Sequence, residues 1–287
     1  MLDRIYQTFR LLLRQRDMKL ITGGVIILTI VAAAILAPLI APHDPLELNN
    51  DDRLHSPSGN YLLGTDQLGR DTFSRVMFGA RTSLMVGIIS VGAALIIGTS
   101  LGVMAGYYGG IIDDAVMRTA DVIFAFPAII LALVIVSILG ASLVNVIIAI
   151  TLFTTPGIAR LARGLTLSAK EQLYVEAARA MGMNPLRIMR RAILPNIAPP
   201  LIVVATLQIP GAIITEAGLS FLGLGTPPPA ATWGSMLSRS RVFMQTAPWM
   251  TLAPGIAIML VIIGFALFGD SLRDIFDPRS QSRRSQK

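Results

Sequence analysis

Long apolar runs with almost no charge constrain this chain more than any other feature of its sequence. A helix needs roughly 20 mostly apolar residues to cross a bilayer, and six segments have that character. They cover residues 21–40, 83–106, 122–139, 143–162, 201–222 and 250–268. Only 14% of the 287 residues are charged, against about 25% in a soluble domain. The sequence therefore predicts an all-α polytopic membrane protein with six transmembrane helices.

Proline interrupts four of the six segments, at Pro127, Pro156, Pro210 and Pro254. Such kinks are tolerated where neighbouring helices or water satisfy the freed backbone carbonyls. The pattern therefore favours a packed bundle around a pathway over isolated membrane anchors.

Most of the 24 Lys and Arg residues lie in three places: an N-terminal arm, the loop between the fourth and fifth segments, and the C-terminal tail. Six spans put all three on one face, and positive charge marks the cytoplasmic face. The net charge of +7 therefore reflects topology, and no nucleic-acid partner is expected. Both termini are predicted to be cytoplasmic. The expected order is an arm (1–20), a first helix (21–40), an extracytoplasmic loop (41–81), a five-helix core (82–269) and a basic tail (270–287).

The first apolar segment has features of a cleaved signal peptide, because a basic arm precedes it and it contains the small-residue run VAAA. Cleavage would leave five spans and would place one basic end on the wrong face. An uncleaved signal-anchor is therefore expected.

The loop after the first segment holds both histidines, His43 and His55, among several carboxylates. They are twelve residues apart and lack the close spacing of metal ligands, so no metal site is predicted. The same loop contains GTDQLGRD (64–71), where Arg70 and Asp71 replace the Lys and Ser/Thr that a phosphate-binding loop needs. We expect a tight turn that leads into an amphipathic stretch, and no nucleotide on this chain.

Small residues recur every fourth position in the second segment, at Gly98, Gly102 and Gly106. This spacing lets helix backbones approach closely in lipid, so helix packing is expected; lining a conduit is the alternative.

Glu216 is the carboxylate that lies well inside an apolar segment. An intramembrane acid is a candidate functional group, so Glu216, with the nearby Pro210 and Gly211, could belong to a pathway. The alternative, equally open, is that Glu216 caps a helix broken near this point.

The most specific stretch is EAARAMGMNPLRIMRRAILPN, which begins at Glu176. It predicts a helix over 173–181 ended by Gly182, then a second helix over 186–193. Asn184 is a good N-cap, Pro185 suits the first helical position, and Pro195 is expected to stop the second helix. Apolar residues at Leu186, Ile188, Met189 and Ile193 indicate a surface buried against something else.

The pattern formed by Glu176, Ala177, Ala178 and Gly182, followed by Leu194, Pro195 and Pro199, resembles the EAA loop of ABC importer permeases. GTDQLGRDTFSRVMFGARTSL, GYYGG, FAFPAI, SFLGLG, WGSML and GDSLRDIFDP are similar to the C-type permease subunit of the peptide/nickel subfamily. The chain departs from that pattern at Ala192, Ala231 and Thr232.

The resemblance implies the type I ABC importer permease fold, with a coupling-helix loop over about 164–199. It implies a second, homologous permease as heterodimer partner, two cytoplasmic ATPase subunits that hold ATP and Mg²⁺, and an extracytoplasmic substrate-binding protein. It also implies location in the bacterial inner membrane and no catalysis by this chain. Substrates would be dipeptides or oligopeptides, or alternatively glutathione, nickel chelates or opines.

Two other functions fit the sequence less well. A proton-coupled secondary transporter should show several intramembrane acids or an internal repeat, and Glu216 stands alone in the sequence pattern. An intramembrane hydrolase needs a nucleophile and a base at membrane depth, yet both histidines lie in the outer loop. Neither accounts for the EAA stretch.

Overall fold

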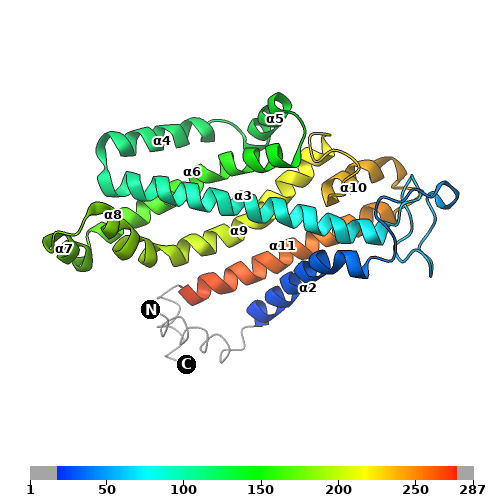
Figure 1. Cartoon of the computed structure of the whole chain (residues 1–287), viewed down its shortest axis with the longest axis horizontal. Coiled ribbons are helices and arrows are strands. Elements are labelled where there is room, and N and C mark those ends of the chain that lie inside the picture. The colour runs from blue at the N-terminus through cyan, green and yellow to red at the C-terminus, as the bar shows by residue number, and fades with distance from the viewer. Residues whose placement is uncertain (1–17, 277–287) are drawn as a thin grey trace.

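The computed structural model describes residues 18–276, and the described chain is helical throughout apart from loops. Five long helices run lengthwise in an elongated bundle (Figure 1): α2 (Met18–Ile40), α3 (Thr72–Tyr108), α6 (Leu143–Lys170), α9 (Leu194–Phe221) and α11 (Trp249–Phe276). The shorter elements are α4 (Gly110–Phe124), α5 (Ala128–Leu139), α7 (Leu173–Ala180), α8 (Pro185–Ile188), α10 (Trp233–Ser240), η1 (Asn50–Asp52), η2 (Met189–Ile193) and η3 (Arg241–Phe243). The basic arm before Met18 and the last part of the tail lie outside the described residues.

The five long helices are each apolar and long enough to cross a membrane, and the predicted all-α membrane class is confirmed. The third predicted span, over 122–139, is not a straight helix. α4 ends at Phe124, α5 begins at Ala128, and the two are bent by 91° around Pro127. The structure therefore has six spans only if this bent pair counts as one.

α3 begins at Thr72, eleven residues before the start predicted for the second span. Its N-cap is Asp71, whose Oδ2 accepts hydrogen bonds from the Ser74 backbone N–H at 2.9 Å and the Ser74 hydroxyl at 2.6 Å. A carboxylate at this position satisfies backbone donors that the first turn leaves free. The amphipathic stretch predicted after GTDQLGRD is therefore the beginning of α3.

The three small residues of α3 face α6. A Cβ atom at Gly98 would lie 2.8 Å from the Thr155 carbonyl oxygen, and one at Gly106 would lie 2.8 Å from that of Arg163. Gly102 lies between them, at the same contact. α3 and α6 consequently pack backbone against backbone, as small residues allow.

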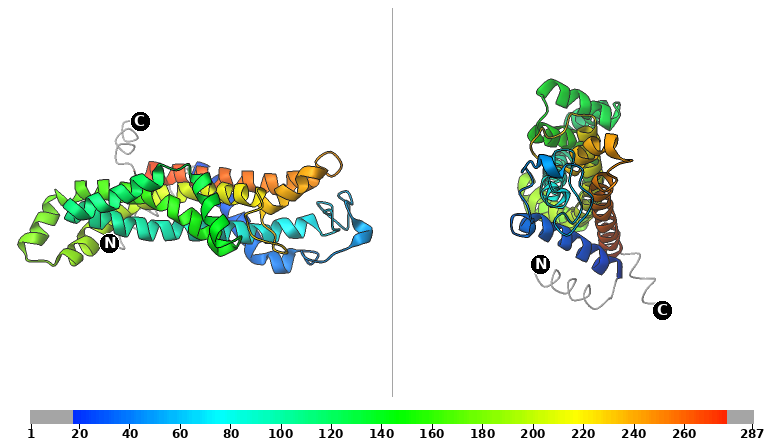
Figure 2. Two further views of the ribbon diagram at one scale, coloured as in Figure 1. Left: turned by 90° about the horizontal axis from the view of Figure 1, so that it is seen from above. Right: turned by 90° about the vertical axis from the view of Figure 1, so that its right-hand side faces the viewer.

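The two ends of the bundle differ in character. One end carries the 41–71 loop and α10, and the other carries α7 and α8 (Figures 1 and 2). Between them, large apolar side chains face outward, including Leu39 (83% exposed) and Ile138 (78% exposed). Lipid makes such exposure favourable, whereas large apolar patches are rare on soluble monomers.

Candidate functional site

The EAA stretch forms a compact block at one end of the bundle, made of α7, α8 and the turn between them. Gly182 has φ +70°, a left-handed conformation that glycine adopts without strain. Its N–H donates to the Arg179 carbonyl at 2.9 Å, and the Met183 N–H donates to the Ala178 carbonyl at 3.1 Å. This pair of bonds is the Schellman motif, which ends a helix sharply.

α8 starts immediately after this turn. The Asn184 side-chain oxygen accepts a hydrogen bond from the Leu186 N–H at 2.9 Å, so Asn184 is the N-cap. Pro185 occupies the first turn, where its missing N–H has no partner to lose. Gly182, Asn184 and Pro185 together fix the angle between α7 and α8.

The prediction that Pro195 ends the second helix is wrong. η2 is a π-helical turn in which the Leu194 N–H donates to the Met189 carbonyl five residues earlier, and α9 follows without a break. In a regular α-helix the Pro195 ring would collide with the carbonyl four residues before it. The wider π turn relieves that collision, so residues 185–221 form one continuous helix of 37 residues.

The apolar side of the block faces the bundle rather than outward. Ile188, Met189 and Ile193 are buried together with Val175 and Ala178, against Val103 of α3 and residues of α6. The expectation that these residues await a separate partner is therefore wrong for three of them. Leu186 alone of the predicted four stays exposed, at 57%.

The outward face of the block combines a carboxylate with different apolar residues. Glu176 and Ala177 are exposed, and beside them in sequence Leu173 is 81% and Met181 74% exposed. Sequence reasoning missed Leu173 and Met181, although the three-residue offset of Leu173 from Glu176 places those two on one helical face. Exposed apolar side chains around a rigid turn are typical of a protein contact.

Glu216 is completely buried near the opposite end of the bundle. It accepts a hydrogen bond from the Ser220 hydroxyl at 2.7 Å, and that hydroxyl lies 3.4 Å from the hydroxyl of Thr232. Thr232 is the N-cap of α10, in a reciprocal capping box with Ser235. Glu216 therefore sits at the junction of α9 and α10. Of its two sequence neighbours, Pro210 is buried and Gly211 is on the exposed side of α9.

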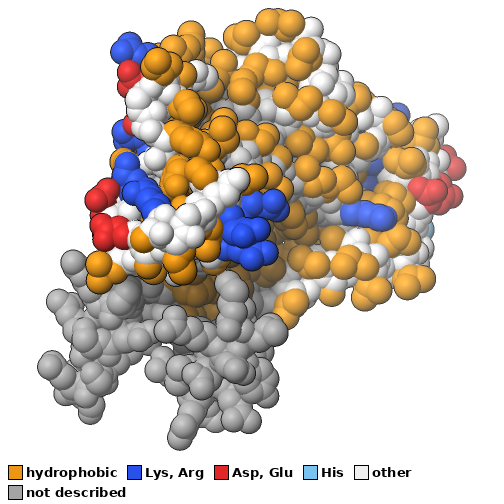
Figure 3. Space-filling view, turned by 60° about the vertical axis from the view of Figure 1, so that its left-hand side comes forward, with side chains coloured by type: hydrophobic (Ala, Val, Ile, Leu, Met, Phe, Trp, Pro, Cys, Tyr) orange, Lys and Arg blue, Asp and Glu red, His pale blue; other side chains and the backbone are white. Residues whose placement is uncertain are grey.

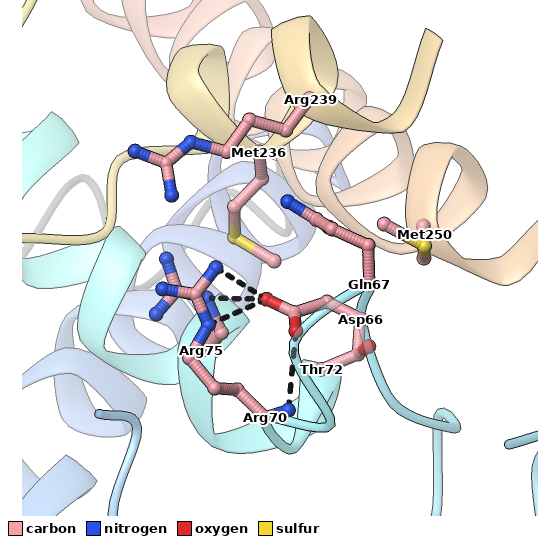
Figure 4. Close-up of a pocket in the computed structure, with 8 residues that line it drawn as sticks. All are labelled: Asp66, Gln67, Arg70, Thr72, Arg75, Met236, Arg239 and Met250. Carbon is pink, nitrogen blue, oxygen red and sulfur yellow. Dashed lines mark hydrogen bonds and ion pairs between the residues drawn. The ribbon is translucent and has the colours of Figure 1, made fainter. Parts of the chain in front are cut away.

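The GTDQLGRD stretch contributes to a cluster of charged side chains at the same end (Figure 4). The Asp66 carboxylate accepts a hydrogen bond from Arg70 Nε at 2.7 Å and lies 3.6 Å from Arg75 Nε. Arg75 also donates from Nη1 to the Pro45 carbonyl at 2.8 Å. Arg239 of α10 lines the same pocket as this cluster. Burial lowers the pKa of the Arg239 guanidinium, and the nearby positive charge of Arg70 lowers it further.

Trp233 connects α10 to α3, a role that sequence reasoning missed. It is 1% exposed, donates from Nε1 to the Val76 carbonyl at 3.0 Å, and packs on Gly79. The sequence did contain a signal for this packing role. The chain has two tryptophans, and Trp233 directly follows the N-cap residue Thr232.

The two histidines of the outer loop flank an aromatic ring. His43 stacks on Tyr61 with ring centroids 4.9 Å apart, and His55 lies at 5.9 Å from the same ring. His43 Nδ1 also lies 3.7 Å from Asp71 Oδ2, and His55 Nδ1 lies 2.8 Å from the carbonyl oxygen of Ser56.

Two family models match this chain. The "binding-protein-dependent transport system inner membrane component" matches residues 98–282, and the "N-terminal TM domain of oligopeptide transport permease C" matches residues 16–57. The first covers the EAA block, all of α6 and the part of α3 from Gly98 onward.

Individual relatives agree with these families. The dipeptide transport system permease protein DppC of Alkalihalophilus pseudofirmus is 48% identical over 91% of this chain and 86% of that protein. The glutathione transport system permease protein GsiD of Pectobacterium atrosepticum is 44% identical over 91% of this chain and 87% of its own length.

Solved structures show the same fold. An inward-facing crystal form of the MetNI methionine ABC transporter matches with a TM-score of 0.55 and 24% identity, over 71% of this chain and 97% of that one. This chain belongs to the family of binding-protein-dependent transport system inner membrane components, and it is a permease subunit of an ABC importer of the peptide type, in which separate subunits hydrolyse ATP.

Proposed function

We propose that this chain carries small peptides across the inner membrane as the C-type half of a permease heterodimer. Two cytoplasmic ATPase subunits bind ATP and Mg²⁺, and an extracytoplasmic binding protein delivers the peptide to the end that bears α10. The family supports this set of partners, and the α7–α8 block, with both termini, faces the cytoplasm.

The observation that carries the proposal is the construction of the α7–α8 block. Its inner side is buried on α3 and α6, whereas Glu176, Leu173 and Met181 point outward. A block that is anchored on one side and exposes a carboxylate and apolar groups on the other suits docking to a second protein. The proposed docking residues are Glu176, Ala177, Ala178, Gly182, Asn184, Pro185, Leu194 and Pro195.

Within this set the residues have different tasks. Glu176 and Ala177 are exposed and contact the ATPase, whereas Ala178 is buried and Gly182 shapes the turn. Leu194 and Pro195 join the block to α9. ATP-driven closure of the ATPase pair moves the block, and α9 moves with it.

Charge reversal tests the docking role. Glu176→Lys should reduce uptake to background and lower the ATPase that copurifies by at least fivefold. Glu171→Lys is the matched control, because Glu171 is also exposed and lies five residues earlier; it should leave both near wild type. Full ATPase retention by Glu176→Lys would contradict the assignment.

A second pair of variants tests the turn. Gly182→Asp and Gly140→Asp each place a side chain at a glycine with positive φ and open space around it. Gly140 connects α5 to α6, outside the proposed docking block. Only Gly182→Asp should reduce ATPase copurification, and equal losses would show a general folding defect instead.

The substrate is proposed as a dipeptide or similarly short peptide because a relative named for dipeptide transport is 48% identical to this chain. Glutathione is the second candidate, since GsiD relatives are 43–44% identical. The intact complex should be purified with its binding protein, and the retained ligand identified by mass spectrometry. A retained dipeptide supports the first candidate, and retained glutathione the second.

A further inference from the structure

An apolar groove runs between α3 and the start of the long 185–221 helix, close to the α7–α8 block. It has a volume of about 330 Å³ and is lined by Val103, Met104, Leu186, Met189 and Leu194, with Arg190 at its edge. The groove remains open to the surroundings although much of the block's apolar surface is buried.

A second hollow adjoins the groove and shares Leu186 and Arg190 with it. This hollow has a volume of about 550 Å³, and its lining includes three exposed arginines, Arg187, Arg190 and Arg191. We call these three the arginine cluster. Figure 3 shows basic side chains next to a broad apolar surface on this side of the molecule.

No carboxylate among residues 18–276 forms an ion pair with the arginine cluster. Across residues 18–276, the recorded ion pairs of arginine involve Arg70, Arg75, Arg160 and Arg163, and none involves the cluster. Positions 187, 190 and 191 are three and four residues apart, which places the side chains on one helical face. Three positive charges therefore project together without a paired carboxylate from the described part of the chain.

The depth of the groove fits the inner leaflet of a bilayer. Its α3 residues, Thr99 to Met104, lie four to nine residues before the end of α3 at Tyr108, or about 6–14 Å along a helix. Ile96, one turn deeper, is 71% exposed. The groove thus adjoins an exposed apolar residue on one side and the arginine cluster on the other, an order that matches an acyl chain followed by its headgroup.

We propose that the groove and the arginine cluster bind an anionic phospholipid of the inner leaflet. One acyl chain occupies the groove against Val103, Met104 and Met189, and the phosphate meets Arg190 and Arg191. Guanidinium groups match phosphate geometry and bind it through paired hydrogen bonds. Basic pockets between transmembrane helices on the cytoplasmic side recognise such headgroups.

This inference rests on the proposed orientation, with the α7–α8 block in the cytoplasm. It goes beyond the docking role because the groove lies on the flank of the block, and its lipid would connect the block to the membrane. Lipid composition would then influence how the block moves when the ATPases close.

Native mass spectrometry of the purified complex with its ATPases tests the proposal, with phosphatidylglycerol and phosphatidylcholine as probes. The wild-type complex should retain phosphatidylglycerol at least fivefold better. The Arg190→Gln/Arg191→Gln double variant should abolish that preference. Arg81→Gln/Arg241→Gln is the matched control, because it removes two exposed charges near the end that carries α10, and it should keep the preference.

A groove-filling variant separates the acyl chain from the charge. Ser100→Trp, at an exposed groove residue, should reduce phosphatidylglycerol retention while all three arginines remain. Equal retention of both lipids by wild type, or unchanged preference in the double variant, would overturn the proposal. Loss of the ATPase with lipid preference intact would also overturn it, by assigning the arginines to the ATPase.

Orientation is checked independently of lipid binding. The chain contains no cysteine, so a single cysteine at Arg187 reports on one site. In intact cells it should resist a membrane-impermeant thiol reagent. Labelling from outside would overturn the orientation and, with it, both proposals; protection with no lipid preference would overturn the lipid proposal alone.

Discussion

A Cβ atom at Gly102 of α3 would lie 2.2 Å from the carbonyl oxygen of Ala159 in α6. No real side chain tolerates that separation, so α3 and α6 keep their present distance only while residue 102 is glycine. Small residues are what allow membrane helices to approach this closely.

Gly102→Ala should therefore destabilise the subunit by about 1–3 kcal/mol, because the added methyl group forces α3 and α6 apart. The measurement is the thermal unfolding midpoint of the purified protein in detergent. Gly92→Ala is the matched control on the same helix, since nothing lies within 4 Å of a Cβ there. An unchanged midpoint in Gly102→Ala would show that the helices separate without cost.

Replacing Glu216 tests whether this carboxylate anchors α10 or carries protons. Glu216→Leu leaves the Ser220 hydroxyl without its acceptor, and a buried polar group left unpaired costs about 1–3 kcal/mol. We expect a lower unfolding midpoint, with Glu216→Gln closer to wild type. Transport by Glu216→Gln should keep the wild-type dependence on pH. Loss of that dependence would instead indicate proton coupling.

The contribution of the Asp71 N-cap to the stability of the protein should be measurable separately. Asp71→Ala removes the acceptor of two hydrogen bonds from Ser74, and loss of an N-cap typically costs about 0.5–2 kcal/mol. Asp51→Ala, an exposed residue of the same loop, is the control. Equal unfolding midpoints for the two variants would contradict the structural role of Asp71.

An ion pair ties α4 to α6. Asp113 of α4 accepts from both Nε and Nη2 of Arg163, which extends from α6. Asp113→Ala should increase hydrogen exchange in α4 severalfold, because local opening depends on few contacts. Asp114→Ala is the neighbouring exposed control. The swap Asp113→Arg/Arg163→Asp should restore much of the protection, and failure of both expectations would show that other contacts, such as the Arg160–Asp121 ion pair, hold α4.

The apolar runs were sufficient to predict the membrane class, but the effect of each proline depended on its surroundings. Pro156 and Pro254 are buried by neighbouring helices, and α6 and α11 continue through them. Pro127 is exposed, and the chain bends there by 91°. Adjacent helices hold a kinked helix together, and a single sequence does not say which helices those are.

The local shape of the α7–α8 block was readable because it depends on Gly182, Asn184 and Pro185, which act within a few residues. The sequence did not show which side of the block faces the bundle. Ile188 and Leu186 are both apolar and two residues apart, yet the first is buried and the second is exposed. The π turn at 189–193, which accommodates the Pro195 ring, also rotates the residues that follow it relative to a regular helix.

The continuous helix over 185–221 can act as a lever arm within the permease. At 1.5 Å per residue its 37 residues extend about 55 Å, from the Asn184 cap to the vicinity of Glu216. A tilt of only about 5° at one end would displace the other by roughly 5 Å over that length. With the ATPase docked at the α7–α8 block as proposed, a small movement there would produce a larger displacement at the opposite end of the bundle.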